Sequence, residues 1–371
     1  MTETMRVHRA DHIGSLVRPL SLLEARRAHA AGTLDAKALR AVEDEAIRDV
    51  VRLQESTGIE VITDGEFRRG TYSDSFTVGG INGVRIELTE DAGWSTSQSH
   101  GHRTARRIPR VVGKVSWKGP QNREDFAFLK SLTSRTCKIT LPGPAYIHYR
   151  SGRANIDKTA YPDLDTFWSD LVEAYHQEMR SLAEAGCTYL QLDETSLVKL
   201  GDERVRALLK ERGDDWRDLL RVYIDVLNRV IAGAPAGMKV GVHICRSQDP
   251  NWQSDVGYDP IAPELFNDLK ADLYLLEYDN PRAGTFAPLR HVPKGKTVVL
   301  GVVAARTLEI EAADAVKRRI EEAAQYISLD QLALSPHCGF GSGAEGKRGI
   351  TPEIEYAKLR LCVDVAREIW G

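Results

Sequence analysis

Short apolar runs alternate with long amphipathic segments along most of the chain, and this alternation restricts its fold more than any other feature. We expect eight buried strands at residues 7–13, 58–64, 136–141, 187–193, 238–244, 272–277, 297–303 and 330–335. Helical periodicity fills most of the intervals, as at 36–56, 165–186, 203–232 and 309–326. Eight strand–helix units favour a closed barrel over an open sheet. The pattern therefore predicts an α/β fold, a (β/α)8 TIM barrel.

The stretch 66–135 is too long for one strand–helix unit. It contains the glycine-rich run 79–83 and the polar run 90–102, so we interpret it as a β-hairpin or loop insertion after the second strand, with a mobile tip. Its basic run 103–110 is interpreted as a solvated hairpin strand rather than a polyanion site. Because no linker or repeat interrupts the pattern, we expect a single domain over 1–371.

Composition excludes several classes of partner. The formal net charge of −3 gives no reason to expect nucleic acid or an anionic membrane. No apolar run approaches the roughly 18 residues that span a bilayer, and the first residues lack a signal-peptide core. Five cysteines, an odd number, indicate reduced thiols. These features predict a cytoplasmic protein with small-molecule partners, and they do not indicate an oligomeric state.

Three of the expected strands end at side chains that bind metals. His243 and Cys245 stand at the end of one strand, Glu277 ends the next, and Cys338 follows the last. Parallel barrel strands bring their carboxyl ends to one face, and alternate strand residues point the same way. One imidazole, two thiols and one carboxylate suit a single Zn²⁺ per chain. The remaining cysteines are interpreted as ordinary buried thiols: Cys137, Cys187 and Cys362.

The charge of this ligand set indicates its chemistry. Two thiolates and a carboxylate leave a zinc site with a net charge of −1, which makes the ion a weak Lewis acid for activating water. Zinc still ionises a coordinated thiol, and an electron-rich site keeps the resulting thiolate nucleophilic. The set therefore predicts alkylation of a substrate thiol. The glycine-rich run 341–348 is not interpreted as a phosphate loop, because Arg348 replaces the Ser or Thr that would reach magnesium.

At this point the motifs resemble the cobalamin-independent methionine synthases, especially their short, single-barrel relatives. The resemblance covers nearly the whole chain and rests on Asp11-His-Ile-Gly-Ser-Leu, Thr63-Asp-Gly-Glu-Phe-Arg-Arg, Leu190-Gln-Leu-Asp-Glu, Val242-His-Ile-Cys-Arg, Leu276-Glu-Tyr-Asp and Ser335-Pro-His-Cys-Gly-Phe. It implies a zinc-dependent methyltransferase that binds homocysteine through sulfur. A 5-methyltetrahydrofolate-type donor would then supply the methyl group, and the product would be methionine.

The resemblance also implies residue roles. The zinc ligands would be the four residues already singled out: His243, Cys245, Glu277 and Cys338. Ile13 and Ser15 would hold the amino-acid carboxylate, partly through backbone groups. Glu66 and Asp193 would hold the ammonium group and are the candidate catalytic residues. Two acids at one barrel mouth repel each other unless a cation lies between them, so this assignment is physically reasonable.

Two departures leave the methyl donor open. Family members with an additional N-terminal barrel carry a His just after the seventh strand, assigned to proton transfer. In this sequence the corresponding residues 301–307 contain Arg306 and no His. The aromatic residue that stacks on the pterin is not clearly matched either, and His148 and Tyr149 are the nearest candidates.

Two alternatives therefore remain at this point. The first is epoxide opening by coenzyme M, whose sulfonate would be expected to use arginines such as Arg18, Arg68 or Arg246. The second is a structural zinc protein without catalysis. Ligands spread over about 95 residues of strand ends fit catalysis better than a closed structural site.

Overall fold

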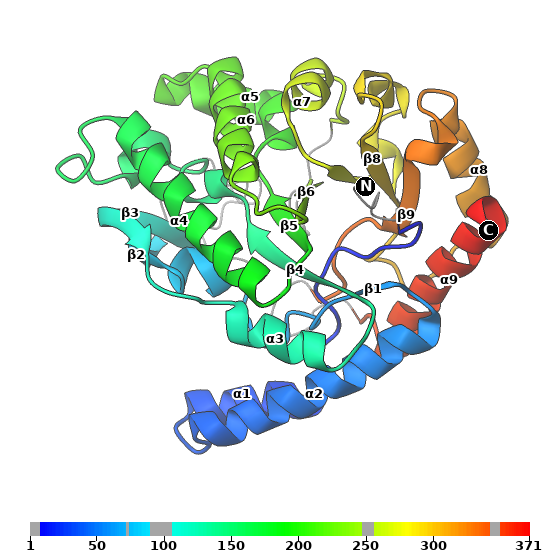
Figure 1. The fold of residues 1–371 in the computed structure, drawn as a ribbon. Coiled ribbons are helices and arrows are strands. Elements are labelled where there is room, and N and C mark those ends of the chain that lie inside the picture. Colours follow the sequence, from blue (N-terminus) through cyan, green and yellow to red (C-terminus); the bar gives the residue numbers. More distant parts are fainter. Residues whose placement is uncertain (1–7, 72–73, 90–105, 247–255, 342–348) are drawn as a thin grey trace.

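A curled parallel sheet of seven strands forms the centre of the molecule (Figure 1). The structure, a computed structural model, describes residues 8–71, 74–89, 106–246, 256–341 and 349–371. The strand order is β1-β4-β5-β6-β7-β8-β9, and every neighbouring pair is parallel. The strands are β1 Val61–Ile62, β4 Thr136–Pro142, β5 Tyr189–Glu194, β6 Lys239–Ile244, β7 Leu273–Glu277, β8 Thr297–Val303 and β9 Leu332–Pro336.

Helices cover the outer side of this sheet, as Figure 1 shows. They are α1 Leu20–Ala30, α2 Ala36–Thr57, α3 Arg123–Ser131, α4 Leu164–Glu184, α5 Glu203–Arg212, α6 Trp216–Ala232, α7 Ala262–Asp268, α8 Ala313–Ala324 and α9 Pro352–Trp370. Several begin at an aspartate whose side chain accepts a hydrogen bond from a first-turn backbone N–H: Asp35 for α2, Asp163 for α4 and Asp215 for α6. Within the described ranges, no helix is both long and apolar enough to cross a membrane.

The architecture is TIM-barrel-like, but the expected eight regular strands are not all present in the described chain. The strand predicted at 7–13 is reduced to one parallel bridge between Ala10 and Leu334 of β9. On the other side of this segment, the backbone N–H of Leu16 donates to the carbonyl of Gly65, just beyond β1 (3.1 Å). The strand predicted at 58–64 is likewise only the two residues of β1. The N-terminal segment therefore lies between β9 and the end of β1 without forming a full ladder.

Between β1 and β4 the chain forms an antiparallel pair, β2 (Ile81–Thr89) and β3 (Arg106–Trp117), followed by α3. This pair is attached to α4, because the indole N–H of Trp117 donates to Glu178 Oε2 (2.8 Å). The segment that joins the two strands, with His100 and His102, lies outside the described residues, as does the glycine-rich run 342–348. The expected hairpin pairing is therefore present in the parts of 66–135 that are described.

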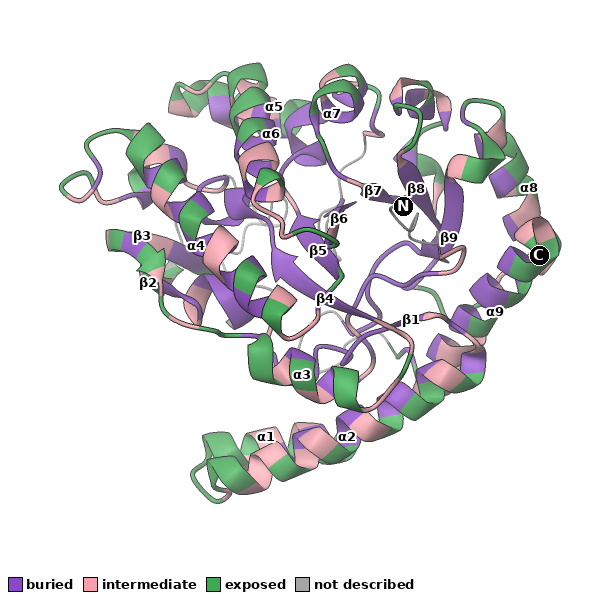
Figure 2. Ribbon diagram, in the orientation of Figure 1, coloured by how far each residue is buried: buried purple, intermediate pink, exposed green. Residues whose placement is uncertain are grey.

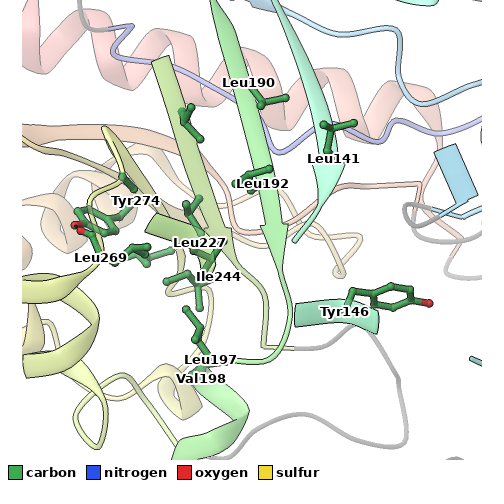
Figure 3. Packing of buried hydrophobic residues seen from close by; sticks show 14 of the residues in the cluster. Leu141, Tyr146, Leu190, Leu192, Leu197, Val198, Leu227, Ile244, Leu269 and Tyr274 are labelled. Carbon is green, nitrogen blue, oxygen red and sulfur yellow. Dashed lines mark hydrogen bonds between the residues drawn. The ribbon is translucent and has the colours of Figure 1, made fainter. Parts of the chain in front are cut away.

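Two apolar clusters hold the sheet in place. The larger one lies between the strands and the helices, where Leu192 of β5 and Ile244 of β6 share a cluster with Leu227 of α6 (Figure 3). The smaller one contains Ile13, Leu275, Val299 and Ala333. The seven parallel strands are buried on both faces, while the helices bury one side only (Figure 2). This explains why the strands appear in the sequence as continuous apolar runs.

Candidate metal centre and the adjoining carboxylate pair

Four side chains from the carboxyl ends of three strands meet in one buried cluster. His243 lies on β6 with Cys245 just after it, Glu277 ends β7, and Cys338 follows β9. One potential ligand atom from each residue lies within 4.8 Å of those of all the others. All four residues are buried, and Glu277 is fully inaccessible. The structure thus brings together the complete set that the sequence pattern singled out.

Backbone groups next to the cluster orient two of its side chains, His243 and Glu277. The ring atom Nδ1 of His243 lies 3.3 Å from the carbonyl oxygen of Leu275, which can only accept, so Nδ1 carries a proton and Nε2 is the ring atom that faces the cluster and could bind a metal ion. His243 Nε2 is 3.7 Å from Cys338 Sγ and 3.9 Å from Glu277 Oε1. The backbone N–H of Arg246 donates to Glu277 Oε2 (3.1 Å). Glu277 Oε1 has no hydrogen-bond partner among the described residues.

The electrostatics of the cluster favour a bound cation. Burial and the neighbouring Cys245 raise the pKa of Glu277 to about 8. Burial alone would lower the pKa of His243, but Cys245 and the nearby carboxylates raise it to about 9. A hydrogen bond from Cys338 lowers the pKa of the Cys245 thiol, and the same contact raises that of Cys338. Without a cation these groups compete for protons, whereas a divalent ion would stabilise all the anionic forms together.

A second polar group, formed by Glu66 and Asp193, adjoins the cluster. Asp193 is the register neighbour of His243 across β5 and β6. Its Oδ1 accepts a hydrogen bond from Gln191 Nε2 (2.7 Å), and Glu66 Oε1 accepts one from Thr140 Oγ1 (2.8 Å). Burial, with a contribution from the charge of Glu66, raises the pKa of Asp193 to about 7. Arg69 already pairs with Glu66 (Nη1–Oε1, 3.6 Å), whereas Asp193, whose ionisation burial and the charge of Glu66 oppose, is suited to a further positively charged group.

The backbone around Glu66 is strained. Within the described chain, Glu66 is the only non-glycine residue with positive φ, at 59°. Gly14, with φ of 147°, approaches it so closely that an added Cβ would lie 3.0 Å from Glu66 Oε1 and 2.9 Å from Thr140 Cγ2. Strain of this kind persists where the surrounding structure holds a side chain in a required position. Here it holds the Glu66 carboxylate against the N-terminal segment.

Ile13 and Ser15, the other predicted substrate residues, border the same region. The carbonyl of Ile13 accepts a hydrogen bond from Gln191 Nε2 (2.7 Å), the same amide nitrogen that donates to Asp193. The carbonyl of Ser15 accepts one from the backbone N–H of Phe340 (2.9 Å). Ser15 Oγ also lies directly against Gly339, beside Cys338. The N-terminal segment therefore bridges the carboxylate pair and the metal cluster.

The two candidates for stacking on a pterin are buried instead. His148 Nδ1 and the hydroxyl of Tyr223 form a hydrogen bond (2.9 Å), and the His148 ring packs against Trp168. Burial lowers the pKa of His148 to about 3, so it is neutral. Tyr149 is only 1% exposed. Both positions thus belong to the packed interior, because the short helix Pro144–Ile147 that leads to His148 is itself buried.

Two features of the site were not among the sequence-predicted residues. Arg306, after β8, directs its guanidinium at the cluster, with Nη2 3.5 Å from Glu277 Oε1. Its position at a strand end was the available signal, but a single arginine there does not reveal its direction. Lys138 Nζ forms a buried ion pair with Asp11 Oδ1 (2.8 Å), and Tyr189 donates to the same carboxylate (2.7 Å). A lysine within an apolar strand run gave no indication of this partner.

Comparison with known proteins agrees with this arrangement. The family model for the catalytic domain of cobalamin-independent synthases matches residues 10–368. An uncharacterized Bacillus subtilis protein, YxjH, is 36% identical over 98% of this chain and 94% of its own length. A methionine synthase of Pyrococcus abyssi is 26% identical over 96% and 90% of the two chains. A crystal structure from Listeria monocytogenes, described as a putative vitamin-B12-independent methionine synthase, shares 32% identity and a TM-score of 0.75, covering 98% of each chain.

Family match, fold and residue cluster agree, and we conclude that the chain belongs to the cobalamin-independent methionine synthase family.

Proposed function

We propose that this protein is a zinc-dependent methyltransferase that methylates homocysteine to methionine, with residues 1–371 as one catalytic unit. The observation that carries the proposal is the juxtaposition of two groups: a buried His, Glu and two-thiol cluster, and a buried carboxylate pair one strand away. The first group suits activation of a thiol, and the second suits an ammonium group. Homocysteine contains both functions in one small molecule.

The donor set fits one zinc ion held by His243, Cys245, Glu277 and Cys338. When bound there, zinc would lower the pKa of a substrate thiol and keep its sulfur as a nucleophilic thiolate. The protein's own contribution is orientation. The Leu275 carbonyl fixes the His243 ring, and the Arg246 backbone N–H holds one oxygen of Glu277. The site is buried, which limits competition from water.

Recognition of the amino-acid part would use the groups beside the cluster. Glu66 and Asp193 would flank the ammonium, whose charge relieves their mutual repulsion. The segment from Ile13 to Ser15 would bind the carboxylate through its backbone. Arg69 pairs with Glu66, but a sulfonate thiol such as coenzyme M has no ammonium and would leave the buried Asp193 without a cation to favour its ionised form, so the amino-acid thiol is favoured. The proposed methyl donor is of the 5-methyltetrahydrofolate type.

A donor panel tests the reaction. Purified zinc-loaded protein is offered homocysteine with methyltetrahydrofolate in mono- and polyglutamate forms, methylcobalamin, or small methylated compounds, and methionine is quantified. We expect methionine with the folate donor. Formation of methionine from another donor alone would overturn the folate assignment, and no product with any donor would contradict the methyltransferase assignment.

A matched pair of thiols tests recognition. Homocysteine and 4-mercaptobutanoate differ only in the amino group, and their binding can be compared by titration calorimetry. The wild-type protein should prefer homocysteine by about tenfold or more, since a buried charge pair is worth at least about 1.4 kcal/mol. Glu66→Gln should remove most of this preference, whereas Glu24→Gln, an exposed control on α1, should keep it. Equal binding of the two thiols by the wild type would contradict the assignment.

A further inference from the structure

The guanidinium of Arg306 places a positive charge next to the proposed metal centre. It follows β8, and its side chain is only 11% exposed. Nη2 lies 3.5 Å from Glu277 Oε1, and that oxygen accepts no hydrogen bond within the described ranges. Nε and Nη2 of Arg306 also lack hydrogen-bond acceptors in the part of the chain that the structure describes. These two nitrogens form one edge of the guanidinium, the edge that suits a carboxylate.

The neighbouring charges explain why a cation is held here. Four neighbouring acidic groups favour the charged form of the Arg306 guanidinium: Glu277, Cys338, Cys245 and Asp279. Two thiolates and the Glu277 carboxylate carry three negative charges, and a divalent ion together with Arg306 carries three positive charges. An incoming thiolate sulfur would therefore bring the centre to −1, instead of the −2 that it would reach without Arg306. At short range in a buried site, one unit of charge is a large energetic difference.

We propose that Arg306 is a positioning residue that sets the charge of the metal centre, favouring the binding of an anionic substrate sulfur at the expense of affinity for the metal cation. It acts through Glu277, whose Oε1 atom it faces at 3.5 Å. The inference rests on the proposed function, because it concerns the same thiol-binding centre. A guanidinium stays protonated in proteins, so Arg306 at the end of β8 supplies a permanent charge and does not deliver a proton to the methyl donor's leaving group.

The proposal makes two affinities change in opposite directions. Arg306→Gln removes a charge that repels the metal and attracts the thiolate. Zinc affinity, measured without thiol by competition with a chromophoric chelator, should increase about tenfold. Homocysteine affinity, measured on cobalt-substituted protein through the increase in thiolate-to-cobalt absorption on adding homocysteine to the band already given by the two cysteines, should decrease about tenfold. The thiol proton is released to the buffer on binding, so the pH of half-maximal binding should rise by about one unit.

Two further variants separate charge from shape. Arg306→Lys keeps the charge and loses the two-nitrogen edge, and it should remain within about threefold of wild type in both affinities. Arg318→Gln removes an equal charge from an exposed position on α8 and should change neither. A purely structural role for Arg306 would make Arg306→Gln bind both metal and thiol more weakly. That result, or unchanged thiol affinity, overturns the proposal.

Failure of the inference differs from failure of the proposed function. A wild-type protein that binds cobalt but shows no change in the thiolate-to-cobalt band when homocysteine is added would contradict the proposed thiol chemistry. The zinc competition would still decide the charge role of Arg306, since unchanged or weaker zinc binding by Arg306→Gln contradicts it. Conversely, the same increase in the thiolate-to-cobalt band at the same homocysteine concentrations in wild type and Arg306→Gln would leave the methyltransferase proposal intact and reject the role of Arg306.

Discussion

Replacement of Asp193 by asparagine should stabilise the thiol-free protein and weaken homocysteine binding. Asp193 is buried beside Glu66, and burial together with that charge raises its pKa from 3.8 to about 7. Ionising Asp193 in the folded protein therefore costs free energy when no ammonium group is present. Asparagine keeps nearly the same shape and can still accept the hydrogen bond from Gln191, but it carries no charge.

The magnitude follows from the linkage between protonation and folding. A carboxyl group whose pKa is raised in the folded state contributes stability that is complete below pH 3.8 and is lost as the pH rises through about 7. With a folded pKa of about 7, this group costs on the order of 1.4 kcal/mol of stability between pH 6 and pH 8.5. The stability of Asp193→Asn relative to wild type should therefore increase by about that amount over the same interval.

Urea denaturation of zinc-loaded, thiol-free protein at pH 6 and pH 8.5 measures this difference. Homocysteine titration at pH 8 should show weaker binding by the variant, by about tenfold or more. Glu24→Gln on the exposed face of α1 provides the control for a change in total charge. A stability difference that does not change with pH, or a variant that is destabilised at both pH values, would refute the reasoning about this carboxylate pair.

Three other substitutions test separate parts of the site. Cys338→Ser should reduce zinc affinity by on the order of a hundredfold or more in a chelator competition, and a zinc-replete, fully active variant would contradict its role as a ligand. Lys138→Met should cost about 3–5 kcal/mol in urea denaturation because Asp11 would stay buried without its ion pair; zinc affinity should not change, and unaltered stability would count against this pair. Gly14→Ala should weaken homocysteine binding about tenfold in calorimetry without affecting zinc, since its Cβ would press on Glu66; unchanged homocysteine affinity would show that this contact is unimportant.

Much of the strand arrangement could be predicted from local pattern. β8 (Thr297–Val303) coincides with the predicted range, and the other long parallel strands agree within about two residues at each end. Strands buried on both faces require continuous apolar runs, which are easily recognised in a sequence. The N-terminal run could not be predicted in the same way. Whether it forms a ladder depends on how closely β9 and β1 approach it, and among the described residues of this run only Ala10 forms a bridge.

The meeting of His243, Cys245, Glu277 and Cys338 was determined by the sequence, once parallel strands were expected. Parallel strands end at one face, so residues at their carboxyl ends converge whatever the details of packing. Their role as zinc ligands remains a proposal. The family could also be predicted from the sequence, because the motifs at these strand ends are distributed along nearly the whole chain.

Only the tertiary structure decided how the charged groups of the site interact. The direction of Arg306, the strained backbone of Glu66 and the raised pKa of Asp193 depend on distances between groups far apart in the sequence. Charge interactions change steeply with distance and burial, and neither quantity can be obtained from local periodicity. The sequence by itself therefore determined which chemical groups meet at the carboxyl ends of the parallel strands. The fold decided how those groups affect one another, because it removes them from water and places them within a few ångströms.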